Sequence, residues 1–532
     1  MTTANALPFI EVAHELTPAS LQRASLVHKL PKGAHIHISG VCGTGMASVL
    51  QLLKEKGFYV TGSDKAFYPP MGDVVRKTAD RVFESYNEAN LSPEPKLVVI
   101  GNSLSRGNPE IEYVLSRGIP FASMPEVFSA LLIGTREECR TSVVVAGTHG
   151  KTTTTSAVAT ILDVSGLKPG YFVGGIPKDL PSSIRLPAAD LPPTQRVVVL
   201  EGDEYDSAFF SKFSKFHSYR PDIAIITSLE FDHADIFSSI EDIEREFTSF
   251  VGRVPENGLV LVCDDDEQLV DLAARWQRDG IVKAELAFYG SQPDSKYQLL
   301  KREQIDRSGR SSISLGTEDT LAQELSVSLS GVEVKLRTPL TGIHNALNLL
   351  AASAVAQRLG LSAPQIAAAV PKFHGVLRRQ HVVANVDGVL IIEDFAHHPT
   401  AVKVTLEGLR ERYQSRRLVA VYEPRSNTSR RAFFQDAYVT SFAAADEVVL
   451  LEVADIGAFS GTAGDTGALD VKRLASEIAS TGTMASSKPS IAELQSYLLR
   501  TLGSGDVVVL MSNGDFGGLI QSLPLALAAI QH

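Results

Sequence analysis

The sequence predicts an α/β fold of three domains, each organised around a parallel sheet. The chain of 532 residues is longer than one hydrophobic core usually serves, so several domains are expected. Short runs of β-branched and aliphatic residues alternate with amphipathic helical segments, which is the pattern of doubly wound sheets. Two of these runs end in glycine-rich turns that open a helix. We place the three domains at residues 1–134, 135–375 and 376–532.

The composition excludes several classes of protein. A net charge of −11 gives the chain no general attraction for nucleic acid or anionic membranes. Cys42, Cys139 and Cys263 are widely spaced, which argues against a disulfide framework and favours a reducing compartment. The N-terminus lacks the pattern of a secretory signal, and no stretch reaches about 18 uninterrupted apolar residues. We therefore expect a cytoplasmic protein, a monomer or a weak homodimer, without nucleic-acid or membrane partners.

The strongest motif is a phosphate loop between a predicted buried strand, Ser142–Ala146, and a helix. The N–H groups of such a loop favour an anion, its lysine reaches the outer phosphates, and its threonine hydroxyl ligates Mg²⁺. The loop is short, because Val145 stands where the general pattern has its first glycine. The alternative is a glycine-rich turn that carries a surface lysine. The residues expected at the nucleotide phosphates are Gly147, Thr148, His149, Gly150, Lys151, Thr152 and Thr153.

A second glycine turn opens the first domain. A predicted strand, His35–Ser39, is followed by this turn, an amphipathic helix and another strand. The arrangement resembles a dinucleotide-binding unit, although Gly40, Gly43 and Gly45 reverse the usual glycine spacing. A diphosphate at the helix start is expected, and Asp64 lies where such units contact a ribose or base. The turn alone would also suit a dehydrogenase, but the phosphate loop argues against that.

Two acidic clusters directly follow predicted strands of the central domain. Glu201–Asp206 follows the strand Arg196–Leu200, and Glu230–Asp235 follows the strand Ile223–Thr227. The carboxyl ends of parallel strands meet at one edge of a sheet, and carboxylates avoid burial unless they are paired or bind metal. With Thr152, the two clusters could hold a hydrated Mg²⁺ beside phosphate oxygens. The alternative is that both are ordinary solvated loops.

The remaining segments complete the predicted architecture. Residues 1–32 form an extension with one short helix, Pro18–His28, and residues 281–340 predict a small antiparallel subsheet. A helix is expected at Leu340–Gly360, before a hinge-like segment at Phe373–Gln380. Later strands are expected at Gly388–Phe395, Arg417–Tyr422, Glu447–Glu452 and Asp506–Met511. We therefore expect Rossmann-like terminal domains around a central P-loop ATPase-like domain, whose parallel sheet is accompanied by the antiparallel subsheet.

Six motifs follow one another along the chain. They are AGTHGKTTTT, LEGDEYD, EFDHADIF, GIHNALN, GVLRR and EDFAHHPT. Together they resemble the Mur ligase family, the ATP-dependent amide-forming enzymes of peptidoglycan synthesis. The stretches GSDKAFYPPMGDVV, DEYDSAFFSKFSKFHSYRP and YEPRSNTSRR further resemble the branch that acts in peptidoglycan recycling. That branch joins the tripeptide L-Ala-γ-D-Glu-meso-diaminopimelate to UDP-N-acetylmuramic acid.

This resemblance implies ligation through an acyl phosphate. The muramic carboxylate would attack the γ-phosphate of ATP, and the peptide amine would then displace phosphate from the acyl carbon. Lys151 and two Mg²⁺ ions would screen the negative charges that meet in this reaction. Thr152 and Glu201 would hold the first metal and His233 the second. The family often has a carbamylated lysine near the second metal, but here the corresponding stretch reads EREFTSF, without lysine.

The resemblance also assigns the other ligand contacts. His344 and Asn345 would contact adenine, Asp394 would bind ribose, and Arg379 or its neighbour Arg378 would reach the γ-phosphate from the third domain. An ATP site divided in this way implies domain closure about Phe373–Gln380 during catalysis. The expected substrate contacts are Gly43, Thr44, Gly45, Asp64, Asn102 and Ser103 for the UDP-sugar, His398 or its neighbour His397 near the phosphates, and Arg425 for the peptide.

Two other functions stay open on the sequence. The L-alanine-adding branch of the family, UDP-N-acetylmuramate–L-alanine ligase, would share the first two domains and differ in the third. A nucleotide-binding regulatory protein without ligase activity would need no second metal, so the acidic clusters argue against it. Arg425 suits a peptide carboxylate by its fork geometry, but it could also be a solvated surface arginine.

Overall fold

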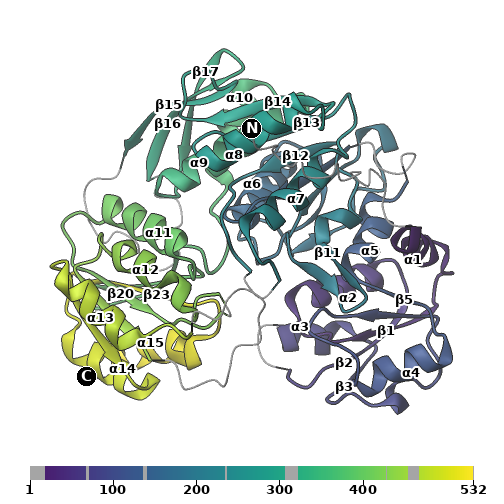
Figure 1. Ribbon diagram of the computed structural model, residues 1–532, viewed down its shortest axis with the longest axis horizontal. Helices are drawn as coiled ribbons and strands as arrows, with labels where there is room; N and C mark the ends of the chain where they lie inside the picture. Colours follow the sequence, from purple (N-terminus) through teal and green to yellow (C-terminus); the bar gives the residue numbers. More distant parts are fainter. Residues whose placement is uncertain are drawn as a thin grey trace, which may run out of the picture.

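A computed structural model describes residues 18–67, 71–135, 141–233, 236–305, 322–426, 428–452 and 467–530. Figure 1 shows three lobes: an N-terminal lobe in purple to blue, a central lobe in teal and a C-terminal lobe in green to yellow. Each lobe contains its own large sheet, of 5, 10 and 6 strands respectively. The predicted three-part α/β organisation is confirmed.

The N-terminal sheet is parallel throughout, in the order β3-β2-β1-β4-β5. Its strands are β1 (His35–Ser39), β2 (Tyr59–Ser63), β3 (Arg81–Phe83), β4 (Leu97–Ile100) and β5 (Phe121–Ala122). Its helical segments are α1 (Pro18–Lys29), α2 (Thr44–Glu55), α3 (Met71–Thr78), η1 (Glu88–Leu91), α4 (Pro109–Arg117), α5 (Met124–Phe128) and a π-helical turn, η2 (Ser129–Ile133). The strand order reverses between β1 and β4, and doubly wound sheets bind ligands in the crevice at that point.

The central sheet has the order β17-β16-β15-β14-β13-β12-β6-β9-β7-β8. Its strands are β6 (Thr141–Ala146), β7 (Gly170–Phe172), β8 (Ile184–Arg185), β9 (Val197–Glu201), β12 (Ile223–Ile226), β13 (Leu259–Cys263), β14 (Glu285–Gly290), β15 (Tyr297–Gln304), β16 (Gln323–Leu329) and β17 (Val332–Thr338). Strands β15, β16 and β17 are antiparallel to one another, as predicted for residues 281–340, but β14 in the same region is parallel to both of its neighbours. The antiparallel strands therefore extend the main sheet and do not form a separate one.

The helices of the central lobe cover this sheet. They are α6 (Lys151–Val164), α7 (Ile240–Val251), α8 (Glu267–Arg278), α9 (Ile343–Arg358) and α10 (Ala363–Ala369), with short 3-10 turns η3 (Pro193–Gln195), η4 (Lys215–Ser218) and η5 (Val370–Lys372). A small hairpin is formed by β10 (Asp206–Ala208) and β11 (Ser211–Ser214). Helices α6 and α9 pack against each other, and their buried alanine, serine and threonine side chains allow a close approach.

The C-terminal sheet has the order β18-β19-β23-β20-β21-β22, in which only β18 is antiparallel to its neighbour. Its strands are β18 (His381–Val386), β19 (Val389–Asp394), β20 (Leu418–Tyr422), β21 (Glu447–Leu451), β22 (Met484–Lys488) and β23 (Val507–Met511). Its helical segments are α11 (Pro399–Arg412), η6 (Ala432–Phe434), α12 (Gln435–Ser441), α13 (Val471–Ser480), α14 (Ile491–Thr501), η7 (Phe516–Gly518) and α15 (Leu519–Ile530). The sequence prediction missed β18 and β22, the two edge strands.

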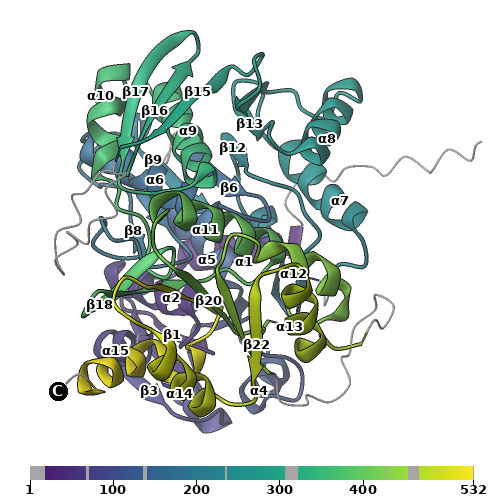
Figure 2. The ribbon, with the colours of Figure 1, turned by 90° about the vertical axis from the view of Figure 1, so that its left-hand side faces the viewer.

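Helix α11 connects the C-terminal lobe to the central one (Figure 2). Arg302 on β15 forms an ion pair with Glu411 near the end of α11, and Nη2 lies 2.8 Å from Oε1. The hydroxyl of Thr341 donates to the carbonyl oxygen of Gly408 at 2.8 Å. These contacts lie beside the predicted hinge, in which Arg378 and Gln380 adopt left-handed conformations with φ of 64° and 46°.

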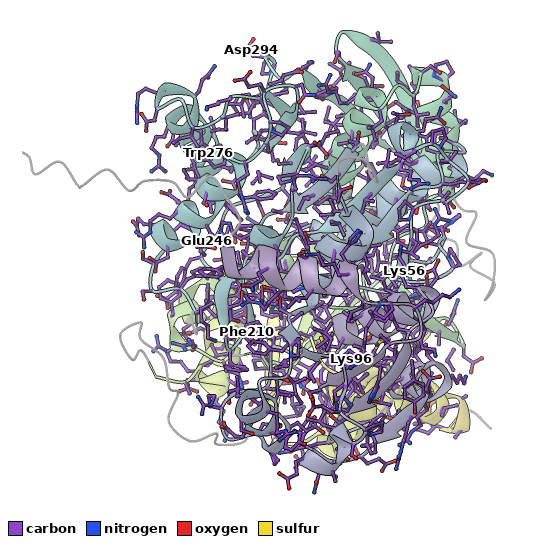
Figure 3. All side chains as sticks on the ribbon, turned by 90° about the vertical axis from the view of Figure 1, so that its right-hand side faces the viewer. Lys56, Lys96, Phe210, Glu246, Trp276 and Asp294 are labelled. Atoms are coloured by element: carbon purple, nitrogen blue, oxygen red, sulfur yellow. The ribbon has the colours of Figure 1, made fainter. Side chains whose placement is uncertain are left out.

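Helix α1 connects the N-terminal and central lobes. Nε of Arg23 donates to Oε1 of Glu126 at 2.8 Å, and the guanidinium lies 5.0 Å from the ring centroid of Phe210 in the central lobe. Phe210 in turn packs edge-on against Phe121, with the ring centroids 4.8 Å apart. Figure 3 shows Phe210 beside this helix. The helix predicted at Pro18–His28 is therefore confirmed, and it has a place in the packing.

Candidate active site

The carboxyl ends of three neighbouring strands of the central sheet form the floor of the site. Strand β6 lies between β9 and β12, with Val145 opposite Glu201 and Ala146 opposite Ile226. Because the three strands are parallel, the loops that follow them leave the sheet side by side. The structure thus brings together the phosphate loop and the two acidic clusters, as the sequence predicts. Asp235, the last acid of the second cluster, lies outside the described residues.

The phosphate loop needs glycine at two positions. Gly147 and Gly150 have φ of 130° and 82°, a region that favours glycine. A Cβ on Gly147 would lie 2.2 Å from Oγ1 of Thr227, and one on Gly150 would lie 2.7 Å from Oδ1 of Asn348. Both glycines therefore allow the loop to approach the neighbouring segments closely.

The side chain of Lys151 lies across the phosphate loop. Its Nζ donates to the carbonyl oxygens of Gly147 at 2.6 Å and Thr148 at 3.2 Å, and it pairs with Oε2 of Glu204 at 2.8 Å. Burial favours the neutral amine, but the carboxylates of Glu204 and Asp203 outweigh it and raise the pKa of Lys151 above its usual value. The loop therefore holds a permanent positive charge where it is expected to bind phosphates.

The segment that follows β12 is hydrogen-bonded to the phosphate loop. The hydroxyl of Thr148 donates to the carbonyl oxygen of Glu230 at 3.1 Å and accepts from the N–H of the same residue at 2.9 Å. The N–H of His149 donates to Oγ of Ser228 at 2.8 Å. The loop conformation is therefore fixed by the strand end beside it, before any ligand is present.

Thr152 and Glu201, which are predicted to share a metal, lie in contact. Oγ1 of Thr152 donates to Oε1 of Glu201 at 2.8 Å, and Oε2 of Glu201 accepts from the N–H of Gly174 at 2.6 Å. Burial raises the pKa of Glu201 to about 7, and the neighbouring Asp203 carboxylate acts in the same direction. A cation beside Glu201 would offset this burial of negative charge.

Glu204 lies between Lys151 and His233. Its Oε1 lies 3.2 Å from Nε2 of His233, while its Oε2 pairs with the lysine. Burial lowers the pKa of His233, but Glu204 and Asp232 outweigh it and raise this pKa to about 9. Oε1 of Glu204 is buried and accepts no hydrogen bond from the described residues. His233 is thus next to Glu204, which the sequence prediction placed in the first acidic cluster without a role of its own. The predicted metal role of His233 stays a prediction.

Arg379 is the arginine of the hinge that faces the central lobe. Its guanidinium lies 4.9 Å from the ring centroid of Phe395. Burial lowers its pKa, while the carboxylates of Asp394 and Glu201 act in the opposite direction. Arg378 instead bonds within the C-terminal lobe, where its Nε donates to Oε1 of Glu393 at 2.7 Å. The structure therefore favours Arg379 over Arg378 as the residue that reaches the nucleotide.

Asp394, the predicted ribose ligand, braces the hinge. Its Oδ2 accepts from the N–H of Gln380 at 2.7 Å, and its Oδ1 accepts from the N–H of Ala396 at the same distance. The side chain is buried, which raises its pKa. Asp394 therefore stabilises the hinge backbone, a structural role that the sequence did not indicate. Its contact with ribose stays a prediction.

The predicted adenine contacts lie at the start of α9, beside the hinge. Burial lowers the pKa of His344 to about 4, and its Nδ1 is buried without a hydrogen-bond partner among the described residues. Nδ2 of Asn345 donates to the carbonyl oxygen of Thr341 at 2.8 Å. One turn later, Oδ1 of Asn348 accepts from the hydroxyl of Thr154 at 3.0 Å. Asn348 thus borders the phosphate loop, a position that the sequence prediction did not give it.

The two histidines before α11 have different surroundings. His398 caps the helix, and its ring centroid lies 4.8 Å from that of His149 in the phosphate loop. Burial lowers the pKa of His398 to about 4, and His149 acts in the same direction. His397 accepts hydrogen bonds at its carbonyl oxygen from the hydroxyls of Tyr422 and Tyr438. Of the two, His398 is the one that the structure places beside the phosphate loop.

The predicted UDP-sugar contacts gather at the crevice of the N-terminal sheet. Gly43 precedes α2, and a Cβ on Gly45 would lie 2.3 Å from Sδ of Met124. Oδ2 of Asp64 accepts from the N–H of Cys42 at 2.9 Å, which fixes the glycine turn. The remaining predicted contacts are Thr44, the first residue of α2, and the exposed Asn102 and Ser103 after β4.

Arg425, the predicted peptide contact, follows β20 at the carboxyl edge of the C-terminal sheet. Its Nη1 lies 2.5 Å from Oδ1 of Asp515, and the two side chains are 49% and 68% exposed. A Cβ on Gly514 would lie 2.1 Å from Nη1 of Arg425, so only glycine allows the guanidinium this position. The arginine is therefore accessible to a ligand, and its role with a peptide stays a prediction.

Comparison with known proteins identifies the family. Three domain descriptions match in succession: "Mur ligase family, catalytic domain" at residues 35–136, "Mur ligase middle domain" at residues 145–356, and "Mur ligase, glutamate ligase domain" at residues 378–514. The UDP-N-acetylmuramate–L-alanyl-γ-D-glutamyl-meso-2,6-diaminoheptandioate ligase of Escherichia coli K12 is 35% identical over 492 residues, which are 92% of this chain and 97% of that protein. This chain belongs to the Mur ligase family. It is an ATP-dependent amide ligase of that family.

Two further comparisons support the assignment. The ligase of the same name from Haemophilus influenzae is 32% identical over 493 residues, which are 92% of this chain and 98% of that protein. A crystal structure of a murein peptide ligase from Psychrobacter arcticus 273-4 is 32% identical and covers 93% of this chain and 99% of that chain, with a TM-score of 0.67. The fold of this Mur ligase is therefore that of a solved relative over nearly its whole length.

Other observations bear on the environment of this Mur ligase. Cys42 and Cys263 are free thiols, and Cys139 lies outside the described residues. Within the described part of the chain, every helix is too short or too polar to cross a lipid bilayer.

Proposed function

We propose that this Mur ligase joins the tripeptide L-Ala-γ-D-Glu-meso-diaminopimelate to UDP-N-acetylmuramic acid at the expense of ATP. The observation that carries the proposal is the position of Lys151, which lies within the phosphate loop and beside a buried set of carboxylates. The similarity to the Escherichia coli ligase, whose name states this pair of substrates, indicates which substrates the site uses.

The residues at the phosphate loop fit an ATP–magnesium complex. The hydroxyl of Thr152 and the carboxylate of Glu201 are hard oxygen donors, which Mg²⁺ prefers. Oε1 of Glu204, which lies 3.2 Å from Nε2 of His233, is a further acceptor that suits a cation. Bound Mg²⁺ would neutralise phosphate charge. Thr152 and Glu201 would hold one ion, and His233 would hold a second one.

The chain itself supplies the other positive charges that the reaction needs. A muramic carboxylate must approach a polyphosphate, so the two anions repel each other unless cations lie between them. Lys151 is fixed in the phosphate loop, and Arg379 faces the same site from the hinge. Because Arg379 belongs to the segment that leads into the C-terminal lobe, closure of that lobe would place the two cations around the transferred phosphoryl group.

The three lobes divide the substrates among them. The UDP-sugar would occupy the crevice at Gly43–Gly45, and ATP would lie between the central lobe and the hinge. The peptide would bind to the C-terminal lobe near Arg425, whose fork suits a carboxylate. The amine would then meet the activated carboxyl group in the space between the lobes.

The test is phosphate release from ATP in the presence of Mg²⁺ and UDP-N-acetylmuramic acid, with either the tripeptide or free L-alanine as acceptor. We expect release with the tripeptide and little with L-alanine. Release with L-alanine alone would identify the chain as the alanine-adding ligase, the name carried by a relative that is 29% identical over 490 residues. Release with neither acceptor would favour a nucleotide-binding regulatory role.

A further inference from the structure

Three side chains from separate segments converge between the central and C-terminal lobes. His149 comes from the phosphate loop, Glu230 from the loop after β12, and His398 from the residue that caps α11. Each offers one ligand atom, and these atoms lie within 4.8 Å of one another. Oε2 of Glu230 lies 3.2 Å from Nε2 of His149 and 3.3 Å from Nδ1 of His398. We call these three residues the interlobe cluster.

The hydrogen bonds around the interlobe cluster leave two acceptors facing each other. Nδ1 of His398 accepts a long hydrogen bond from the N–H of Thr400 at 3.3 Å, so a lone pair, and not a proton, lies at that atom. Because an imidazole nitrogen has one lone pair, a metal at Nδ1 would replace this hydrogen bond. Oε2 of Glu230 is also an acceptor, and it receives the hydroxyl of Thr400 at 2.7 Å. Two acceptors 3.3 Å apart repel each other unless a cation lies near both.

The spacing of these atoms fits a tetrahedral metal. Zinc binds imidazole nitrogen and carboxylate oxygen at about 2.0–2.2 Å, so neighbouring ligand atoms on a tetrahedron lie roughly 3.3–3.5 Å apart. The two measured separations, 3.2 and 3.3 Å, are close to that range. Two imidazoles and one carboxylate are also the donor set of transition metals, whereas Mg²⁺ prefers oxygen ligands.

We propose that His149, Glu230 and His398 form a binding site for a divalent transition metal of the zinc class. This site is separate from the predicted magnesium positions, which involve Thr152, Glu201 and His233. Thr400 would act as a supporting residue, because its hydroxyl orients the Glu230 carboxylate. The inference does not depend on the identity of the substrates.

A metal at the interlobe cluster would connect two parts of the molecule. His149 belongs to the phosphate loop, and His398 begins the helix that carries Glu411, the partner of Arg302 in the central lobe. An ion shared by both histidines would hold the C-terminal lobe against the phosphate loop. It would therefore act on the position of that lobe, and it would occupy two histidines that are expected to lie near the phosphates.

The experiment is a titration of the full-length protein with Co²⁺ alone, followed by visible absorption. Co²⁺ takes the place of zinc in tetrahedral sites of nitrogen and oxygen donors and gives ligand-field bands that oxygen-only octahedral sites show weakly. We expect saturable binding with these bands. Glu230→Gln and His398→Asn should each weaken Co²⁺ binding by roughly tenfold or more. Asparagine is chosen because it still caps a helix, so α11 should keep its start.

Two control variants make the result specific. His217→Gln removes another histidine that faces a glutamate, since Nε2 of His217 lies 2.9 Å from Oε2 of Glu246. His233→Gln removes the histidine of the predicted magnesium site. Both should leave the Co²⁺ bands and their midpoint unchanged. The proposal is overturned if no saturable tetrahedral signal appears, if the signal survives both Glu230→Gln and His398→Asn, or if His233→Gln abolishes it.

Discussion

Lys151 and Glu204 form a buried ion pair, with 2.8 Å between Nζ and Oε2, inside the loop that is expected to receive the phosphates of ATP. The side chain of Glu204 is only 1% exposed, and its other oxygen faces His233. The lysine is thus held in place by a group that is itself next to a predicted metal ligand. This pair links the phosphate loop to the predicted second metal position.

Lys151→Ala should abolish ligation. The substitution removes the positive charge of the phosphate loop, and losses of about 100- to 1,000-fold or more in kcat are typical when such a stabilising group is removed. Binding of the UDP-sugar, measured by isothermal titration calorimetry, should stay close to that of the wild type, because its expected site lies on another lobe. Lys168→Ala, at an exposed lysine paired with Asp190, is the matched control. Loss of ligation and UDP-sugar binding together would argue against separate sites.

Glu204→Gln should lower kcat by roughly tenfold or more while the fold is kept. The amide has nearly the shape of the carboxylate, but it removes the negative charge that holds Lys151 and faces His233. We also expect a higher Mg²⁺ concentration for half-maximal activity, because one acceptor beside His233 becomes a neutral amide. The measurement is the rate of phosphate release as Mg²⁺ is varied. A variant with the wild-type rate and Mg²⁺ dependence would show that Glu204 has only a structural role.

His233→Ala should raise the Mg²⁺ requirement without abolishing ATP binding. The imidazole is the metal ligand predicted for the second ion, whereas Lys151 and Thr152 stay in place to hold the phosphates. The measurement is again phosphate release against Mg²⁺ concentration, with ATP affinity determined separately by calorimetry. His217→Ala, at a histidine paired with Glu246, is the control. An unchanged Mg²⁺ requirement would remove His233 from the metal site.

Arg425→Ala should weaken tripeptide binding more than ATP binding. The guanidinium lies at the exposed edge of the C-terminal sheet and is expected to pair with a carboxylate of the peptide. A rise of roughly tenfold in KM for the tripeptide, with little change in KM for ATP, would fit the loss of one such contact. Arg473→Ala, at an exposed arginine paired with Glu477, is the control. Equal losses for both substrates would contradict the assigned role.

Glu110→Gln should destabilise the N-terminal lobe and make its stability less dependent on pH in the acid range. Glu110 is buried and accepts from the hydroxyls of Ser39 and Ser63, at 2.6 and 2.7 Å. Burial raises the pKa of Glu110, but its hydrogen bonds, led by that from His37, outweigh this and lower it below 4.5. A lowered pKa stabilises the fold above the unfolded value, and this stabilisation is lost as the pH falls through the folded value.

Hydrogen exchange of peptides that cover β1 and β2 measures this effect. At pH 7 the variant should exchange faster than the wild type, by an amount equivalent to about 1–3 kcal/mol for a buried charged hydrogen bond. The wild type should lose protection as the pH falls below about 4.5 and approach the variant. Glu112→Gln, at an exposed glutamate on the same helix, should leave exchange unchanged. An identical acid response in wild type and Glu110→Gln would contradict the argument.

The buried strands could be predicted because a strand covered on both faces is a continuous aliphatic run. The bounds of β1 agree with the sequence prediction, those of β12 differ by one residue at one end, and those of β9 differ by one residue at each end. In the C-terminal sheet, the two strands that were missed, β18 and β22, lie at its edges. Both are only half-buried, and β22 reads MASSK, so neither has the apolar run that marks a buried strand. In the central sheet, the prediction did not name β13 either, although β13 is a buried apolar run.

The sequence could predict which loops form the site, but it could not predict which side chains contact each other within it. The sequence indicates that acids follow β9, but it cannot tell which of Glu201, Asp203 and Glu204 faces Lys151, because that depends on the path of the loop. The sequence left Arg378 and Arg379 as alternatives. The backbone conformation of the hinge decides which of the two side chains faces the central lobe. The contact of Glu230 with His398 joins residues far apart in the chain, for which no local pattern exists.

The ion pair between Arg23 and Glu126 makes helix α1 part of the folded core of the molecule. Glu126 is 1% exposed, and besides the arginine it accepts from the N–H of Ser123 at 2.9 Å at the start of α5. The region that matches the family begins at residue 35, after Arg23. Removing the preceding residues would leave a buried carboxylate without its counter-charge, at a cost of about 3–5 kcal/mol. Helix α1 thus helps to hold two lobes together, and a protein trimmed to its family boundaries would be less stable than the full chain.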